Sequence, residues 1–152
     1  MNIIVDADAC PVLDIIERKA IDNKIDLTYV FDTSHQIHSD YANIIIVDMG
    51  SDSADFKILS KANNESIIIT QDYALASLCL SKKAVIIHPN GFEISNDNID
   101  QLLDSRYLNQ KARKAKIKTA NPKKRTEDLN IKFEELLESI IEKGLNIYKK
   151  KQ

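Results

Sequence analysis

The sequence predicts a three-layer α/β fold, in which helices cover both faces of a mainly parallel, five-stranded sheet. Two observations predict it: short, continuous runs of Ile and Val recur between residues 3 and 88, and segments of helical periodicity separate them. Such runs are typical of strands buried on both faces, as in parallel sheets. The expected strands are Ile3–Val5, Leu27–Phe31, Ile44–Val47, Ile67–Thr70 and Val85–His88.

Three helices are expected between these strands, because apolar residues recur there at helical spacing. The apolar stripes comprise Val12, Ile15, Ile16 and Ala20, then Phe56, Ile58, Leu59 and Ala62, and finally Leu75, Leu78 and Cys79. The polar connection from Thr33 to Tyr41 is expected to form a loop or a short helix. Asn90-Gly91 is a turn signal.

Beyond Gly91 the pattern is helical. The spacing predicts a helix over Asn98–Lys118 with a basic second half, which Asn121-Pro122 ends. Thr126 is expected to cap an amphipathic helix whose apolar face comprises Leu129, Phe133, Leu136, Leu137, Ile140 and Ile141. Residues 98–152 are therefore expected to form a basic helical C-terminal extension, packed on the rest of one domain that spans residues 1–152.

The charge is divided along the chain. Residues 1–105 hold 7 basic and 17 acidic side chains, whereas residues 106–152 hold 14 and 6, and the formal net charge is −2. This asymmetry favours an acidic site beside a basic, polyanion-binding surface. Asp6 and Asp8 exclude a secretory signal, and no apolar run approaches the length of a membrane span. With only Cys10 and Cys79 as thiols, we expect a reduced, cytoplasmic protein that is not bound to a membrane.

Aspartates follow three of the five expected strands. Asp6 and Asp8 follow the first strand, the third runs into Asp48, Asp52 and Asp55, and the fourth into Asp72. The carboxyl ends of parallel strands share one edge of the sheet, so these carboxylates should converge. A single Asp before a helix is more often a cap than a ligand, and Asp52 is expected to be a plain cap. Convergence of three segments favours a site for a hard divalent cation, Mg²⁺ or Mn²⁺.

A basic segment, 106–125, contains no acidic residue and is the candidate surface for nucleic acid. Arg106, Lys111, Arg113 and Lys114 begin it, and Lys116, Lys118, Lys123, Lys124 and Arg125 continue it. Phosphate contacts of such residues give binding that weakens with salt. The alternative is a solvated helix face. Apart from Tyr107 no aromatic residue accompanies the charges, so base stacking is not predicted.

Three further side chains are chemically active types without a clear partner. Cys10 is expected at the start of a helix, where a thiol can be activated, but no base is evident and an inert, packed thiol is the simpler interpretation. His35 and His38 lack the additional ligands of a zinc site. His88 ends the fifth strand and is interpreted as a core or loop histidine.

Several blocks of the sequence resemble the YaiI/YqxD family, a bacterial family of uncharacterised proteins. The block Val5-Asp6-Ala7-Asp8-Ala9-Cys10-Pro11-Val12 resembles its opening signature. Later blocks follow in the same order, at 50–55, 70–76, 98–100 and 106–113, so the resemblance covers nearly the full chain. In place of the family's Gly-Pro near the C-terminus stands Asn121-Pro122, which argues against a tight phosphate-binding loop there.

That family is grouped by fold with PIN-like domains, which are nucleases that bind Mg²⁺ or Mn²⁺ through clustered acidic side chains. Thr70-Gln71-Asp72 is similar to the PIN motif Thr-x-Asp, and Asp55-x-x-Ile58 to its acidic helix start. The resemblance implies a metal-dependent nuclease, with RNA the expected substrate. Asp6, Asp8 and Asp72 are then the candidate catalytic residues, and the candidate metal ligands are Asp6, Asp72, Asp55 and Asp48.

Two other functions remain open. Asp6-Ala7-Asp8 after a strand is similar to the nucleophile and acid of haloacid-dehalogenase-type phosphatases, in which Asp6 would form an aspartyl phosphate. The order of the later motifs disagrees with that superfamily, because the acidic block 48–55 precedes Thr70. The third possibility is a non-catalytic protein that binds RNA or regulates on the same fold. The sequence by itself does not define an oligomeric state.

Overall fold

The computed structural model describes residues 1–50, 52–114 and 124–151, with the backbone alone for Arg113 and Lys114. Within these residues a six-stranded sheet has the order β3-β2-β1-β4-β5-β6. The strands are β1 (Asn2–Asp6), β2 (Asp26–Asp32), β3 (Asn43–Val47), β4 (Ser66–Ile69), β5 (Val85–His88) and β6 (Phe92–Ile94). β1 to β5 pair in parallel, and β6 pairs antiparallel with β5.

The α/β class and the mainly parallel sheet are confirmed, but the prediction of five strands was wrong by one. The additional strand, β6, has only three residues and follows the turn at Asn90-Gly91. A segment this short carries too few residues to display strand periodicity, so the sequence pattern did not distinguish it from a loop. The expected connection from Thr33 to Tyr41 is irregular and contains no helix.

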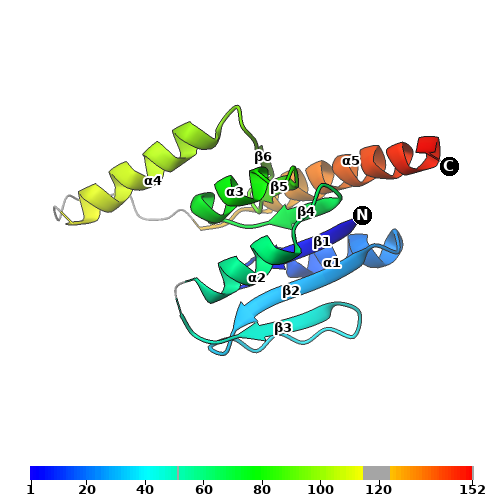
Figure 1. The fold of residues 1–152 in the computed structure, drawn as a ribbon, viewed down its shortest axis with the longest axis horizontal. Helices are drawn as coiled ribbons and strands as arrows, with labels where there is room; N and C mark the ends of the chain where they lie inside the picture. The colour runs from blue at the N-terminus through cyan, green and yellow to red at the C-terminus, as the bar shows by residue number, and fades with distance from the viewer. Residues whose placement is uncertain (51, 115–123, 152) are drawn as a thin grey trace.

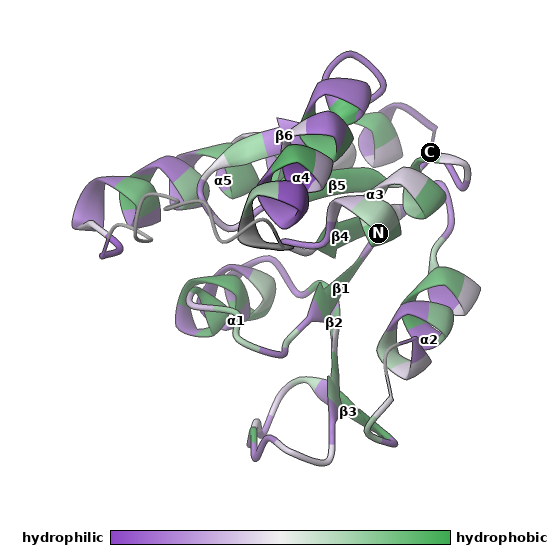
Figure 2. Ribbon diagram, turned by 90° about the vertical axis from the view of Figure 1, so that its left-hand side faces the viewer, coloured by the Kyte–Doolittle hydropathy of each residue, from purple (hydrophilic) through white to green (hydrophobic). Residues whose placement is uncertain are grey.

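Helices lie on both faces of the sheet (Figures 1 and 2). On one face α1 (Leu13–Asp22) and α5 (Glu127–Lys151) pack against β1, β2 and β4. On the other face α2 (Ser53–Lys61), α3 (Tyr73–Leu80) and α4 (Ile99–Lys114) cover alternate residues of the same strands. Neighbouring strand residues point to opposite faces, so Ile3 and Val5 enter one core and Ile4 the other.

Two residues of the expected apolar stripes face solvent instead of the core. On α2, Ile58 is fully buried whereas Phe56 is 70% exposed. Residues two apart on a helix point in nearly opposite directions, so both cannot face the sheet. On α3, Leu78 is half exposed beside the buried Cys79.

The C-terminal part of the chain does not form a uniformly basic extension, which corrects that expectation. α5 contains six acidic and five basic side chains and buries Phe133, Leu137 and Ile141 against the sheet. It begins directly after Thr126, as predicted. α4 is described from Ile99 to Lys114, and its second half projects beyond the sheet (Figure 1). The predicted end near Lys118 and the break at Asn121-Pro122 lie outside the described residues.

The turn between β5 and β6 packs against the start of α5 and is hydrogen-bonded to the residue just before Thr126. Arg125 donates hydrogen bonds to the carbonyl oxygen of Pro89 (2.7 Å) and to Oδ1 of Asn90 (2.9 Å). Gly91 has a φ of +88°, and a Cβ there would lie 2.7 Å from the backbone nitrogen of Phe133. The turn therefore requires glycine both for its backbone conformation and for its close approach to α5.

We predict that Gly91→Ala lowers the free energy of unfolding by roughly 2–4 kcal/mol, because it adds left-handed backbone strain and a steric overlap with α5. Urea denaturation followed by circular dichroism measures the change. Lys83→Gly is the matched control, because Lys83 has a φ of 61° that glycine adopts without strain. This control should change stability by no more than about 1 kcal/mol. An Ala variant as stable as the parent would contradict the close approach.

Candidate functional site

The carboxyl edge of the sheet carries a cavity of about 590 Å³ whose wall contains five carboxylates. Its lining residues are Asp6, Asp8, Asp32, Val47, Met49, Gly50, Ala54, Asp55 and Asp72. Strand order reverses here, because the chain passes from β1 outward to β2 and β3 and then returns to place β4 on the other side of β1. Such a switch point is where open α/β sheets bind ligands.

Asp6 is the centre of this group, at the end of the central strand β1. Its Oδ2 accepts a hydrogen bond of 2.9 Å from Oγ1 of Thr70, which itself is buried. The same Oγ1 accepts a hydrogen bond of 3.0 Å from the backbone N–H of Asp72. Thr70 therefore connects the ends of β1 and β4 and fixes Asp6 relative to Asp72.

Asp72 caps the start of α3 and also lines the cavity. Its Oδ1 accepts hydrogen bonds from the backbone N–H groups of Ala74 (2.9 Å) and Leu75 (3.2 Å) at the start of α3. These bonds hold the carboxylate in a fixed orientation. Asp72 can therefore cap the helix and belong to the candidate site at the same time. Asp52 stands at the N-cap position of α2 as expected, but its side chain makes no capping hydrogen bond.

Burial and the repulsion between neighbouring carboxylates oppose the ionisation of all the aspartates in the cavity wall. Burial raises the pKa of Asp6 to about 6, and the charges of Asp55, Asp8 and Asp72 add to the shift, against the hydrogen bond from Thr70. The pKa of Asp55 is also raised, first by burial and then by the charges of Asp72 and Asp52. Both effects favour a neutral carboxyl group, and a bound cation would relieve them.

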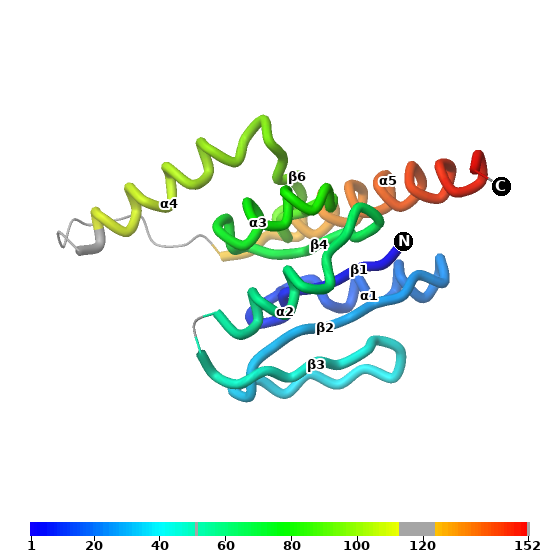
Figure 3. Tube along the Cα trace, viewed as in Figure 1, coloured from blue at the N-terminus to red at the C-terminus, as the bar shows by residue number. Residues whose placement is uncertain are grey.

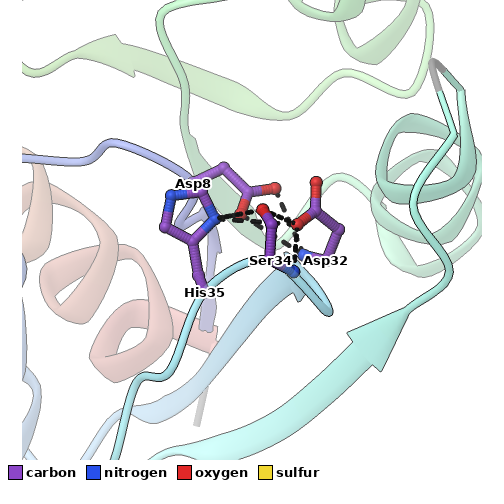
Figure 4. A network of polar contacts seen from close by, with 4 residues as sticks. All are labelled: Asp8, Asp32, Ser34 and His35. Carbon is purple, nitrogen blue, oxygen red and sulfur yellow. Dashed lines mark hydrogen bonds and ion pairs between the residues drawn. The ribbon is translucent and has the colours of Figure 1, made fainter.

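A second polar group joins the cavity through Asp8 and the loop after β2 (Figure 4). Nδ1 of His35 lies 2.7 Å from Oδ1 of Asp8 and 3.6 Å from Oδ1 of Asp32. Both oxygens of Asp8 accept from the backbone N–H of Asp32, at 3.3 Å. Ser34 donates to Asp32 from its backbone N–H and its hydroxyl, and this lowers the pKa of Asp32. One ligand atom from each of Asp8, Asp32 and His35 lies close enough to the others to hold one metal ion.

The structure thus brings together Asp6, Asp8, Asp55 and Asp72 but not Asp48, which is exposed and does not line the cavity. Sequence reasoning missed Asp32 and did not connect His35 to the acidic group. The signal for Asp32 was present, since it directly follows the apolar run Leu27–Phe31 just as Asp6 follows the first strand.

The candidate basic surface begins beside this cavity. Arg106 and Lys111 are exposed on α4, and the charge of Arg106 acts on Asp55, whose pKa it lowers against the other effects. Arg113 and Lys114 belong to the last turn of α4, and their side chains are not among those described. Lys116, Lys118 and Lys123 also lie outside the described residues.

Both cysteines are free thiols without signs of activation. Cys79 is buried, Cys10 is half-buried, and burial raises the pKa of each to about 11. The interpretation of Cys10 as a packed thiol agrees with this direction, because a nucleophilic cysteine requires a lowered pKa. Burial also lowers the pKa of His88 to about 4, with a smaller effect from Arg125.

Among the described residues, no helix is both long and apolar enough to span a membrane.

These observations define an α/β protein with a carboxylate-lined cavity at the switch point of its sheet. The model of the family described as "Uncharacterized BCR, YaiI/YqxD family" matches residues 4–143. The chain therefore belongs to the YaiI/YqxD family, as its sequence blocks predicted.

The sequences of bacterial relatives align with this chain along nearly their whole length. A UPF0178 protein of Clostridium novyi is 44% identical, over 95% of this chain and 97% of its own. A UPF0178 protein of Oceanobacillus iheyensis is 46% identical, over 94% of this chain and all of its own. A third, from Lachnoclostridium phytofermentans, is 44% identical over 92% of this chain and 99% of its own. No solved structure matches the chain.

We predict that Asp6→Asn stabilises the metal-free protein at pH 7.5 by roughly 1–3 kcal/mol and has little effect at pH 4. The folded protein retains the proton of Asp6 up to a pKa of about 6, whereas the unfolded chain loses it near 3.8. The free energy of unfolding therefore falls as the pH rises from about 4 to about 6. Asparagine stays neutral and can still accept the hydrogen bond of Thr70.

Urea denaturation in the presence of a chelator, at both pH values, measures this difference. Asp48→Asn is the matched control, because Asp48 is exposed and outside the cavity. A variant of Asp6 that gains no stability between pH 4 and pH 7.5 relative to the parent would contradict the burial of this charge.

Proposed function

We propose that this protein is a divalent-metal-dependent nuclease that hydrolyses phosphodiester bonds, with RNA as the substrate class. The observation that carries the proposal is the cavity with Asp6, Asp8, Asp32, Asp55 and Asp72 in its wall, at the edge where open α/β sheets bind ligands. Carboxylates that raise one another's pKa values are unfavourable for folding alone, and such clusters are typical of functional sites.

The donor set fits a hard divalent cation. All five groups are carboxylates, which suit Mg²⁺ and Mn²⁺, and the nearby imidazole of His35 favours Mn²⁺ of the two. Over the described part of the chain, no Lys or Arg forms an ion pair with Asp6, Asp55 or Asp72. A divalent cation supplies Lewis-acid activation of water and neutralises phosphate charge when bound.

The residues have separate roles in this proposal. Asp6 and Asp72 hold the metal, with Asp72 oriented by the N–H groups of α3 and Asp6 by Thr70. Asp55 completes the acidic wall, and Asp8 accepts a proton or hydrogen bonds on the side of His35. The similarity of Thr70-Gln71-Asp72 to the PIN motif supports these roles, because its threonine and aspartate both make hydrogen bonds at the cavity.

A polyanionic substrate is favoured by the charge next to the cavity. Arg106 and Lys111 are exposed on α4, and the charge of Arg106 acts on Asp55 in the wall of the acidic cavity. Basic side chains bind phosphates irrespective of base sequence, and they would counter the repulsion between a nucleic acid and the carboxylates. The exposed Tyr107 is the aromatic residue on this helix.

We predict that the parent protein binds Mn²⁺ saturably and that Asp6→Asn with Asp72→Asn abolishes the binding, measured by isothermal titration calorimetry. Asp48→Asn should retain the affinity, because this exposed carboxylate does not line the cavity. Circular dichroism of each variant tests whether the fold is intact. Equal loss in the Asp48 variant, or unchanged affinity in the double variant, would contradict the assignment of ligands.

We predict that the protein cleaves labelled single-stranded RNA in the presence of Mn²⁺ and that the double variant does not, while both bind the RNA. Arg106→Ala with Lys111→Ala should weaken binding and reduce the slope of log affinity against log salt by about 1–2. Gel electrophoresis and fluorescence anisotropy give the two readouts.

The outcomes distinguish the other candidate functions. RNA binding that survives in the double variant, with no cleavage by the parent, would indicate a non-catalytic RNA-binding protein. Formation of an acyl phosphate at Asp6 from a phosphomonoester would indicate a phosphatase, since hydrolysis by a metal-activated water leaves no phosphate on the protein.

A further inference from the structure

The connection from β1 to α1 contains a strained turn. The backbone N–H of Cys10 donates to the carbonyl oxygen of Ala7 (3.3 Å), so Asp8 and Ala9 are the two central residues of this turn. Ala9 has a φ of 59°, which glycine adopts easily and alanine does not. Among the described residues, the other non-glycine residues with positive φ follow the ends of α1 and α3, where that conformation is common. A strained residue outside such a position persists only where neighbouring contacts hold it.

Gln71 makes such a contact from the connection between β4 and α3. Its Nε2 donates a hydrogen bond of 3.1 Å to the carbonyl oxygen of Ala9, 62 residues earlier in the chain. β1 and β4 are parallel neighbours that end on the same side of the molecule, so the connections that follow them meet there (Figure 3). The side chain of Gln71 is exposed and does not line the cavity. It therefore ties the turn to the neighbouring connection from outside the cavity.

The turn that Gln71 holds also carries Asp8. The carboxylate of Asp8 lines the cavity and accepts hydrogen bonds of 3.3 Å from the backbone N–H of Asp32. On the side of β1 the turn is anchored by the N–H of Ala7, which donates to the carbonyl oxygen of Val30 (2.9 Å). Beyond Asp8 it is anchored by Gln71. The position of the Asp8 carboxylate in the cavity wall thus depends on anchors at both ends of the turn.

We propose that Gln71 is a positioning residue of the acidic cavity: its side-chain amide holds the turn in the strained conformation that keeps Asp8 in the cavity wall. Successive residues of an extended segment point in opposite directions, and the backbone of Asp72 is extended (φ −89°, ψ 107°). Thr70 and Asp72 therefore face the cavity while Gln71 points away from it. Thr70 fixes Asp6 from inside the cavity, and Gln71 fixes the turn that follows Asp6.

The inference rests on the proposed function only in its consequence for metal binding. The hydrogen bonds of Gln71 and Asp8 hold the turn whether or not the cavity contains a cation. When a cation binds, the orientation of the surrounding carboxylates determines how tightly it is held, and groups that do not touch the ion fix that orientation. Loss of the bond from Gln71 therefore weakens Mn²⁺ binding, because one carboxylate of the wall loses its fixed position.

Amide hydrogen exchange of the metal-free protein, measured by NMR, tests the positioning directly. Gln71→Met keeps the length of the side chain and removes the donor. The N–H of Asp32 should then exchange roughly three- to ten-fold faster, because its acceptor Asp8 loses its fixed position. Gln101→Met is the matched control, since Gln101 is exposed on α4. It should leave the exchange of Asp32 unchanged.

Two further measurements separate this role from a general contribution to stability. Adding Ala9→Gly to Gln71→Met should slow the exchange of Asp32 back toward the parent rate, because glycine adopts the conformation of the turn without strain. In calorimetry, Gln71→Met should weaken Mn²⁺ binding by roughly three- to ten-fold, while the midpoint of urea denaturation stays that of the parent.

The outcomes separate the role of Gln71 from the metal site. Unchanged exchange of Asp32 in Gln71→Met, equal acceleration in Gln101→Met, or no recovery with Ala9→Gly would each overturn the role of Gln71. A parent that binds no Mn²⁺, together with faster exchange in Gln71→Met, would refute the metal site and support the positioning role. A parent that binds Mn²⁺, with exchange and affinity both unchanged in Gln71→Met, would do the reverse.

Discussion

The parallel pairing of β1 with both of its neighbours, β2 and β4, is the constraint on which the candidate site depends. Parallel strands end at the same edge, so residues that follow β1, β2 and β4 must meet even though they are distant in the sequence. The chain leaves β1 in one direction and returns on its other side. This reversal separates the connections after β1 and β4 and leaves room for a cavity between them.

The cavity is maintained at an energetic cost that the rest of the fold offsets. Asp6 loses hydration and faces other carboxylates, and the hydrogen bond from Thr70 compensates for only part of this effect. The two apolar cores on either face of the sheet supply the stability that permits it. Unfavourable charge that is held in place by a well-packed structure is typical of sites that bind or transform a ligand. The cluster of carboxylates in the cavity wall supports the proposed cation site more strongly than any single aspartate does.

The C-terminal part of the chain has two separate roles. α5 is nearly balanced in charge and buries its apolar face under β1 and β4, so it contributes to the core. α4 packs its first turns on the opposite face, and Arg106 and Lys111 are exposed further along it. Arg106 stands where the acidic and basic regions meet, since its charge reaches Asp55. The match to the YaiI/YqxD family model over residues 4–143 covers α4 and α5 as far as Lys143.

The sequence by itself determined the α/β class, the first five strands and the convergence of Asp6, Asp55 and Asp72, because β-branched runs, helical spacing and strand-end acids are local patterns. Only the tertiary structure decided the rest. It added β6, which is too short to show a period, and it moved Phe56 and Leu78 to the surface, since helix orientation depends on packing. It also placed Asp32 in the cavity wall and Asp48 outside it. Asp32 and Asp48 both follow strands, but β2 lies next to β1 whereas β3 lies at the edge of the sheet. The local sequence of a strand does not determine its position in the order of strands.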